Sequence, residues 1–203
     1  MRRRRCFESY LERISLRSSK VGKVEMMAKW VIDPDHAVAR FSVRHFMIAN
    51  VEGIFSKMTG LVVFDPPDLG RLSVEAEIEV KSLTTGHAER DQHLLSSDYF
   101  DVERYPKIAF KSERVEPTGG NQGKVAGDLT LRGIPRRVTL DFEYFGPVKS
   151  PFSGKSCIGF SAAGKLDREA YGMTLSHPME GGGLVVGKDV QIHIEIEADL
   201  AAE

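Results

Sequence analysis

Two ten-residue segments alternate between apolar and polar side chains without interruption, and few folds accommodate that pattern. Residues 72–81 read LSVEAEIEVK and residues 190–199 read VQIHIEIEAD, so every second side chain is apolar in both. Successive side chains of a β-strand point to opposite faces, so this period of two is typical of a strand with one buried face. Weaker alternation recurs in six further segments, 38–47, 59–65, 107–115, 124–131, 137–145 and 156–166.

Turn-forming residues separate these segments. Asp65-Pro66-Pro67-Asp68 and Thr118-Gly119-Gly120-Asn121 interrupt the alternation, and Gly133-Ile134-Pro135 is typical of a tight hairpin. Residues 87–97 are the one segment in which we expect a helix. The sequence therefore predicts an all-β chain of about eight strands, mostly antiparallel, arranged as a barrel or a sandwich.

Alternation alone does not decide whether the apolar face points inward. In an outer-membrane barrel the apolar face would meet lipid, between two girdles of aromatic residues. Aromatic residues make up only 8% of this chain and are scattered along it. The connections also include a helix and a long glycine-rich loop in place of short turns. We therefore expect an apolar interior, which in an eight-stranded barrel is either filled by side chains or holds one ligand.

Charge is spread unevenly along the chain. The formal net charge is −1, which argues against an electrostatic nucleic-acid binder. Residues 1–27 nevertheless carry eight Arg or Lys and three Glu, whereas the remainder carries 20 basic and 26 acidic residues. We divide the chain into a basic arm, 1–27, and a barrel domain, 28–203. Cys6 lies in the arm and Cys157 in the barrel domain, so no disulfide framework is expected.

The arm is open to two interpretations. Residues 7–14 place apolar side chains at helical spacing, and a short amphipathic helix there would provide peripheral contact with an anionic membrane surface. Alternatively, the arm is a disordered leader, or sequence upstream of a start at Met26 or Met27. No apolar stretch typical of an export signal follows its arginines, so we expect a cytoplasmic protein.

The stretch ERDQHLLSSDYFD, residues 89–101, is the densest in chemically active groups. Asp91 and His93 could act as a base and its orienting partner, but no Ser or Cys lies in a recognisable nucleophile motif. As a metal site, the stretch offers i, i+4 pairs on different helix faces, which cannot converge on one ion. Residues 182–189, GGLVVGKD, match a phosphate-binding loop in spacing but lack the Ser or Thr that must follow. We expect neither catalysis nor a metal, and no cofactor is required.

Four segments in the same order resemble the YceI-like family. They are WVIDPDHAVARFSVRHFMIANVEGIFSKMTG, ERDQHLLSSDYFDVERYPKIAFKS, GDLTLRGIPRRVTLDF and LDREAYGM, and the likeness covers about residues 29–200. It implies a lipocalin-like antiparallel β-barrel that binds a polyisoprenoid, an isoprenoid quinone or a similar long amphiphile, without catalysis. Many members are periplasmic, and the arm does not look like their signal peptides. The positions that match the family's recurrent polar residues and its late Asp-Arg-aromatic-Gly motif are His45, Arg90, Asp91, His93, Asp167, Arg168, Tyr171 and Gly172.

A ligand cavity can be predicted from the phase of the strands. The large side chains expected to line it are Phe41, Val43, His45, Phe110, Leu129, Phe142 and Phe160. Leu94 and Phe100 would reach the cavity from the helix at 87–97, which flanks the barrel mouth. For Arg90, Asp91 and His93 we expect structural anchoring first and contact with a ligand head group second.

Two other function classes stay open at this point. One is an enzyme acting on a small hydrophobic substrate through Asp91 and His93. The other is a barrel with a filled core that serves as a protein-interaction or stress-related module and holds no lipid. A homodimer is compatible with all three interpretations.

Overall fold

The structure, a computed structural model, describes residues 27–180 and 182–201. The strands are β1 (Lys29–His45), β2 (Ala49–Phe55), β3 (Met58–Val63), β4 (Ser73–Glu79), β5 (Leu83–Thr84), β6 (Lys107–Gly119), β7 (Gln122–Leu131), β8 (Ile134–Lys149), β9 (Ser156–Asp167) and β10 (Val186–Leu200). The helix is α2 (Ala88–Leu95), and the 3-10 helices are η1 (Leu69–Arg71), η2 (Val80–Ser82) and η3 (Arg168–Tyr171). Among the described residues, no helix has the length and apolar character needed to cross a membrane.

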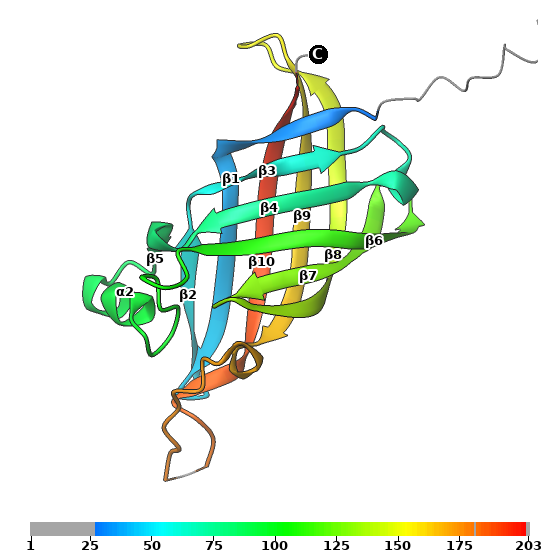
Figure 1. The fold of residues 1–203 in the computed structure, drawn as a ribbon. Helices are drawn as coiled ribbons and strands as arrows, with labels where there is room; N and C mark the ends of the chain where they lie inside the picture. Colours follow the sequence, from blue (N-terminus) through cyan, green and yellow to red (C-terminus); the bar gives the residue numbers. More distant parts are fainter. Residues whose placement is uncertain (1–26, 181, 202–203) are drawn as a thin grey trace, which may run out of the picture.

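Eight strands close into a barrel (Figure 1). Their hydrogen-bonded order is β10-β9-β8-β7-β6-β4-β3-β1, and β1 pairs with β10 to complete the ring. All of these pairs are antiparallel. The start of β1 pairs with β3, whereas its residues from Ala39 to His45 pair with β2. β2 and β5 therefore extend the sheet beyond the ring.

The ring strands are the eight segments predicted from alternation, so the predicted antiparallel barrel is confirmed. Alternation did not reveal β2 or β5. The prediction of one strand over 38–47 was wrong at its end, because the chain turns at 46–48 and returns as β2. Within β2, Gly53 leaves room for the Phe41 ring, since a Cβ atom there would lie 2.3 Å from Phe41 Cζ.

The predicted helix over 87–97 is present but shorter, as α2. His87 is its N-cap, and its Nδ1 accepts a hydrogen bond from the Arg90 N–H at 3.4 Å. At the other end, the Ser96 hydroxyl donates to the His93 carbonyl at 2.7 Å. Serine competes for backbone groups in this way, which makes it a better cap than helix interior.

The outer face of the barrel is polar and carries cross-strand ion pairs. Lys111 Nζ lies 2.6 Å from Glu75, and Lys107 Nζ lies 2.5 Å from Glu77. Such exposed pairs contribute little stability individually. The fold is therefore stabilised mainly from the inside, where the alternate side chains gather. Residues 1–26 lie outside the described residues, so the structure of the basic arm stays a prediction.

Candidate functional site

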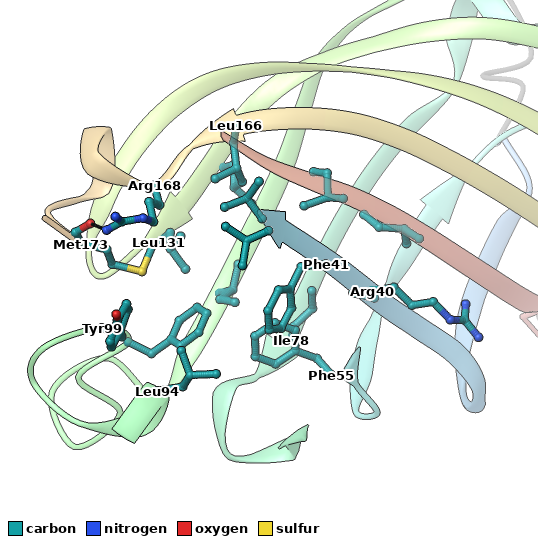
Figure 2. A pocket seen from close by; sticks show the side chains of 18 of the residues that line it. Arg40, Phe41, Phe55, Ile78, Leu94, Tyr99, Leu131, Leu166, Arg168 and Met173 are labelled. Atoms are coloured by element: carbon teal, nitrogen blue, oxygen red, sulfur yellow. Dashed lines mark hydrogen bonds between the residues drawn. The ribbon is translucent and has the colours of Figure 1, made fainter. Parts of the chain in front are cut away.

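The barrel encloses two adjoining apolar chambers. The mouth chamber has a volume of about 130 Å³, and the inner chamber has about 90 Å³. Five side chains line both chambers, which therefore share a wall: Ile78, Ile108, Leu129, Ile192 and Ile194. The remaining lining residues are also apolar, apart from Arg40 and Arg168 and the hydroxyl of Tyr99. Figure 2 shows the mouth chamber, with the guanidinium of Arg40 pointing away from the other lining side chains.

Burial inside the barrel differs between its two ends. Inward residues of β4 and β10, Ile78 and Ile192 among them, are only partly buried although they face the interior. Toward the other end, Ile32 and Phe64 are 1% and 0% exposed. Side-chain surface that stays solvent-accessible inside a closed barrel must border unfilled space. The barrel is therefore hollow toward its mouth and filled at its floor.

The floor is an aromatic cluster. The ring centroids of Phe64 and Tyr144 lie 5.0 Å apart, and those of Phe64 and Phe160 lie 6.1 Å apart. Trp30 Nε1 donates a hydrogen bond to the Phe64 carbonyl at 2.8 Å, which satisfies the one polar group of this buried indole. Phe142 and Phe160 also line the inner chamber, so this cluster forms its end wall.

The segment around α2 covers part of the mouth. Leu94, Tyr99 and Phe100 line the mouth chamber. The Phe100 ring packs edge-on against Phe55 of β2, with the centroids 5.4 Å apart. The hydrophobic contacts of the helix are thus made with the extra strands and with the chamber itself.

Hydrogen bonds accepted by Asp91 and donated by Arg90 attach α2 to the chain just before it. The Asp91 carboxylate accepts bonds from the Thr84 hydroxyl at 3.0 Å, the Thr85 N–H at 2.8 Å and the Thr85 hydroxyl at 2.5 Å. Arg90 Nε donates to Thr85 Oγ1 at 2.7 Å, and Nη2 donates to the Thr85 carbonyl at 2.9 Å. Burial acts to raise the pKa of Asp91, but these bonds from Thr85 and Thr84 outweigh it and lower the pKa overall.

Arg168 connects the segments on the other side of the mouth. It is 3% exposed, and its Nε donates to the Gly187 carbonyl at 2.9 Å and its Nη2 to the Val186 carbonyl at 3.1 Å. Nη1 donates to the Met173 carbonyl. A buried charge must be compensated, and among the described residues backbone carbonyls do so here in place of a carboxylate. We call these contacts the Arg168 clasp.

The residues around Arg168 explain the late sequence motif. Asp167 caps η3 by accepting a hydrogen bond from the Glu169 N–H at 2.9 Å. Gly172 ends η3 with a φ of 76°, a left-handed conformation that glycine adopts without steric cost. The motif therefore builds the turn that presents Arg168 to the mouth.

Residues 30–198 match the family model described as the YceI-like domain. The chain belongs to the YceI-like family. A UPF0312 protein of Staphylococcus aureus is 33% identical over 175 residues, covering 86% of this chain and 99% of the relative. The crystal structure of BcnA from Burkholderia cenocepacia shares the fold, with a TM-score of 0.71 at 24% identity over 82% of this chain and 99% of that one. A polyisoprenoid-binding domain from Saccharophagus degradans does so with a TM-score of 0.61 at 14% identity, over 86% and 99%.

In this YceI-like barrel, the structure brings eight of the predicted site residues together around the chambers. Phe41, Val43, Leu94 and Phe100 line the mouth chamber, and Leu129 lines both. The inner chamber is lined by Phe110, Phe142 and Phe160. Their contact with a ligand stays a prediction, but their position in the barrel is the expected one.

The four polar candidates do not line either chamber. β1 keeps an unbroken register with β2 through His45, and the register shift beside His45 lies in β10. The His45 ring packs against Phe46, with the centroids 4.2 Å apart. His93 Nε2 lies 3.1 Å from Asp98 Oδ2 in the loop after α2. Arg90 and Asp91 bond to Thr84 and Thr85, as the anchoring hypothesis expected. Head-group contact by these four residues stays a prediction.

Several lining residues were not among the predicted ones. Ile192 and Ile194 belong to the alternating segment 190–199, which predicts their inward phase, but the predicted cavity lining did not include them. Met173 and Val186 reach the mouth from segments without strand alternation. No local signal marks them, because their place at the mouth depends on hydrogen bonds from Arg168 and, for Val186, on pairing with β1.

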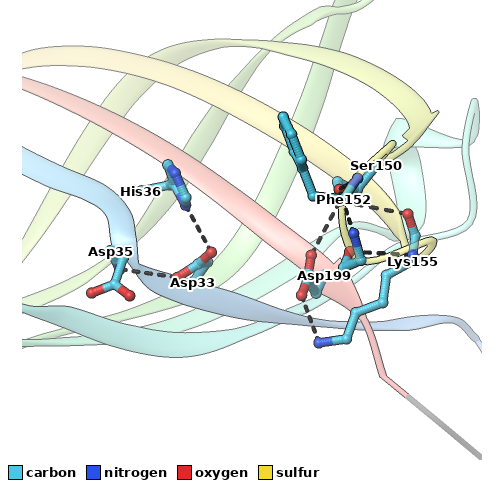
Figure 3. Close-up of polar contacts among 9 residues, drawn as sticks. Asp33, Asp35, His36, Ser150, Phe152, Lys155 and Asp199 are labelled. Carbon is cyan, nitrogen blue, oxygen red and sulfur yellow. Dashed lines mark hydrogen bonds and ion pairs between the residues drawn. The ribbon is translucent and has the colours of Figure 1, made fainter.

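A second polar cluster lies at the floor end of the barrel (Figure 3). The Cys157 thiol donates to Asp199 Oδ1 at 3.1 Å, and Lys155 Nζ lies 2.8 Å from Asp199 Oδ2. One ligand atom each of Cys157, Glu197 and Asp199 lies within 4.8 Å of the others, a spacing that could hold a metal ion. The hydrogen bond to Asp199, together with burial, raises the pKa of Cys157 to about 11. The thiol is therefore protonated at neutral pH, and Lys155 already neutralises Asp199.

Proposed function

We propose that this protein binds the hydrocarbon chain of a long amphiphile, such as an isoprenoid lipid, inside the barrel, and carries or stores it without a chemical step. The observation that carries the proposal is the apolar lining of both chambers. A ligand with polar groups along its length would leave them without hydrogen-bond partners in such a site, at a cost of roughly 1–3 kcal/mol each. A hydrocarbon chain meets no such penalty.

The free energy of binding would come from removing the chain from water. Each buried CH₂ group is worth about 0.8 kcal/mol. The chambers, of about 130 and 90 Å³, are of the order of a cavity of about 150 Å³ that binds benzene. Each therefore takes a short piece of chain. A longer chain would extend through the mouth, or would displace lining side chains.

Two further observations support this ligand class. The chain belongs to the YceI-like family, and the Saccharophagus degradans domain of the same fold is described as polyisoprenoid-binding. The alternatives are supported less well. A filled barrel would not leave two chambers, and an enzyme using Asp91 and His93 would need those side chains to face one substrate. They bond to different partners and line neither chamber.

The direct test is native mass spectrometry of the gently purified full chain, followed by organic extraction and identification of the lipid. We expect a discrete mass increment that resolves to a lipid with a long apolar chain. A clean mass of the protein alone, with no uptake of added isoprenoid quinone, would contradict the proposal.

A cavity-filling variant makes this test specific. Leu129→Trp places an indole where the two chambers meet, and we expect it to fold and to lose the mass increment. The matched control is Thr130→Trp, which introduces the same indole at the next residue of β7, on the outer surface. If both variants keep the lipid, the chambers are not the binding site.

A further inference from the structure

The hairpin between β1 and β2 ends in three consecutive apolar residues that are exposed. Phe46, Met47 and Ile48, here called the apolar tip, are 47%, 45% and 82% exposed. Single exposed apolar residues are common on soluble proteins, but a protruding run of them often marks an interaction site. The tip therefore presents three large apolar side chains to its surroundings.

The apolar tip lies at the mouth of the barrel. The Phe46 N–H donates to the Val185 carbonyl at 2.8 Å, and the next residue, Val186, lines the mouth chamber. Val43, three residues before the tip, lines the same chamber. Figure 1 shows the β1–β2 turn at the same end of the barrel as the segment between η3 and β10, and opposite the β8–β9 hairpin. The exposed surface is thus continuous with the opening of the cavity.

The backbone of the tip is unusual for such side chains. Phe46 and Met47 have φ values of 49° and 62°, a left-handed conformation that hairpins commonly assign to glycine or asparagine. Met47 also packs beside Gly183, where a Cβ atom would lie 2.9 Å from Met47 Cγ. The tip is therefore fixed to the mouth segment in a conformation that its bulky residues do not favour, which suggests a use for their exposure.

We propose that the apolar tip inserts into the surface of a lipid bilayer and brings the mouth of the barrel to the membrane. Three side chains on a protruding turn offer too little area for a protein partner, which needs about 800 Å² on each side. They suit shallow insertion between lipid head groups. Arg44, exposed just before the tip, can extend its cationic end to the head groups. This inference rests on the proposed function, because a cargo with a long apolar chain would be exchanged with lipid.

The test measures binding of the full chain to phosphatidylcholine vesicles by co-sedimentation. These vesicles carry no net charge, so the excess positive charge of residues 1–27 does not dominate the result. We expect Ile48→Ser to weaken vesicle binding about tenfold, since it removes one large apolar side chain from the membrane. Phe46→Ser should act in the same direction. Transfer of lipid cargo between vesicles should slow in parallel.

The matched control is Phe152→Ser, because Phe152 is 97% exposed on the β8–β9 hairpin at the floor end. It should bind vesicles as the unmodified chain does. Equal loss in the control, or no loss in Ile48→Ser, would overturn the proposal, as would a dimer that Ile48→Ser dissociates. Lipid retention in solution separates the two ideas: Ile48→Ser should keep the mass increment, whereas failure of the proposed function leaves every variant without lipid.

Discussion

The floor and the mouth of the barrel are held together by different forces. At the floor, Phe64, Tyr144 and Phe160 pack ring against ring, and Ile32 is almost fully buried. At the mouth, some inward side chains, such as Phe41, Ile78 and Ile192, border empty space and are only partly buried. Hydrogen bonds add to the packing at that end, through the Arg168 clasp and through Asp91.

This difference shows how a barrel can keep a cavity without losing its shape. Unfilled space removes both hydrophobic burial and dispersion contacts from the side chains around it. Directional bonds to backbone carbonyls do not depend on filling the interior. Hydrogen bonds can therefore fix the conformation of the mouth while the cavity behind it stays unfilled. The stability of the two ends should then respond differently to substitution.

The largest difference in the free energy of unfolding is expected when a phenylalanine is replaced by alanine at each end. Phe64→Ala should lower the free energy of unfolding by about 3–5 kcal/mol, because it opens a cavity in a filled core. Phe41→Ala at the mouth should lower it by less than about 2 kcal/mol, since that ring already borders empty space. Chemical denaturation followed by the fluorescence of Trp30, the one tryptophan of the chain, measures both. Equal losses would mean that the mouth is as well packed as the floor.

Removing the Arg168 clasp should have the next largest effect. Arg168→Met keeps an apolar stem but leaves the carbonyls of Met173, Val186 and Gly187 without their donors, at an expected cost of about 2–3 kcal/mol. Hydrogen exchange should accelerate at residues 182–190 and not at the floor. Arg168→Lys should fail to restore protection, because an ammonium group cannot reproduce the planar fork. Full rescue by lysine would indicate that only charge matters here.

A smaller and pH-dependent effect is expected at α2. Because the folded state lowers the pKa of Asp91, its stabilisation is present above the ordinary carboxyl value of about 4 and is lost as pH falls through the lowered value. The hydrogen-exchange protection factors of α2, which are rates corrected for the pH dependence of intrinsic exchange, should therefore fall as the solution is acidified below about pH 4. Asp91→Asn should cost about 1 kcal/mol and should flatten this response.

The neighbouring Asp98 provides a control for Asp91. Its carboxylate contacts His93 and takes no part in the bonds to Thr84 and Thr85. Asp98→Asn should therefore keep the acid response of α2. If Asp98→Asn abolishes the acid response as Asp91→Asn does, the response depends on the net charge around α2 and not on the hydrogen bonds of Asp91 to Thr84 and Thr85.

The smallest effect on stability is expected at the floor cluster. Cys157, with a pKa of about 11, should react slowly with iodoacetamide at pH 8, since only the thiolate attacks. Asp199→Asn in a Cys6→Ser background should accelerate alkylation about tenfold for each unit by which that pKa falls. Lipid binding should not change. An unaltered rate would show that burial of the thiol, and not the carboxylate, protects it.

The sequence predicted the features of this structure that have a local period. Alternation identified all eight ring strands, and the inward phase of Phe41, Phe110 and Phe142 located the chambers. The hairpin predicted around Gly133 is present, with its turn at residues 132–133, and it followed, like the position of α2, from residues with strong local preferences. These predictions succeed because burial on one face imposes a period on the chain itself.

The missed features depend on contacts between distant segments. β5 has two residues and cannot show a period, and β2 includes a glycine that serves the ring of Phe41. His45 keeps the alternation of β1, but its ring packs against Phe46 in the following turn, a contact that alternation does not show. Arg168 was recognised as part of a motif, but its three carbonyl partners come from residues 5 to 19 positions away.

The closing pair of the ring also determines when the protein can fold. β1 finds its partner only in β10, and Phe41 pairs with Ile192, about 150 residues later in the chain. During synthesis, one edge of β1 therefore stays unpaired until almost the whole barrel has left the ribosome. Such long-range closure is slow, and an exposed strand edge can pair with other chains. Rapid overproduction should favour aggregation of nascent chains, even though both edges of β1 are paired in the finished barrel.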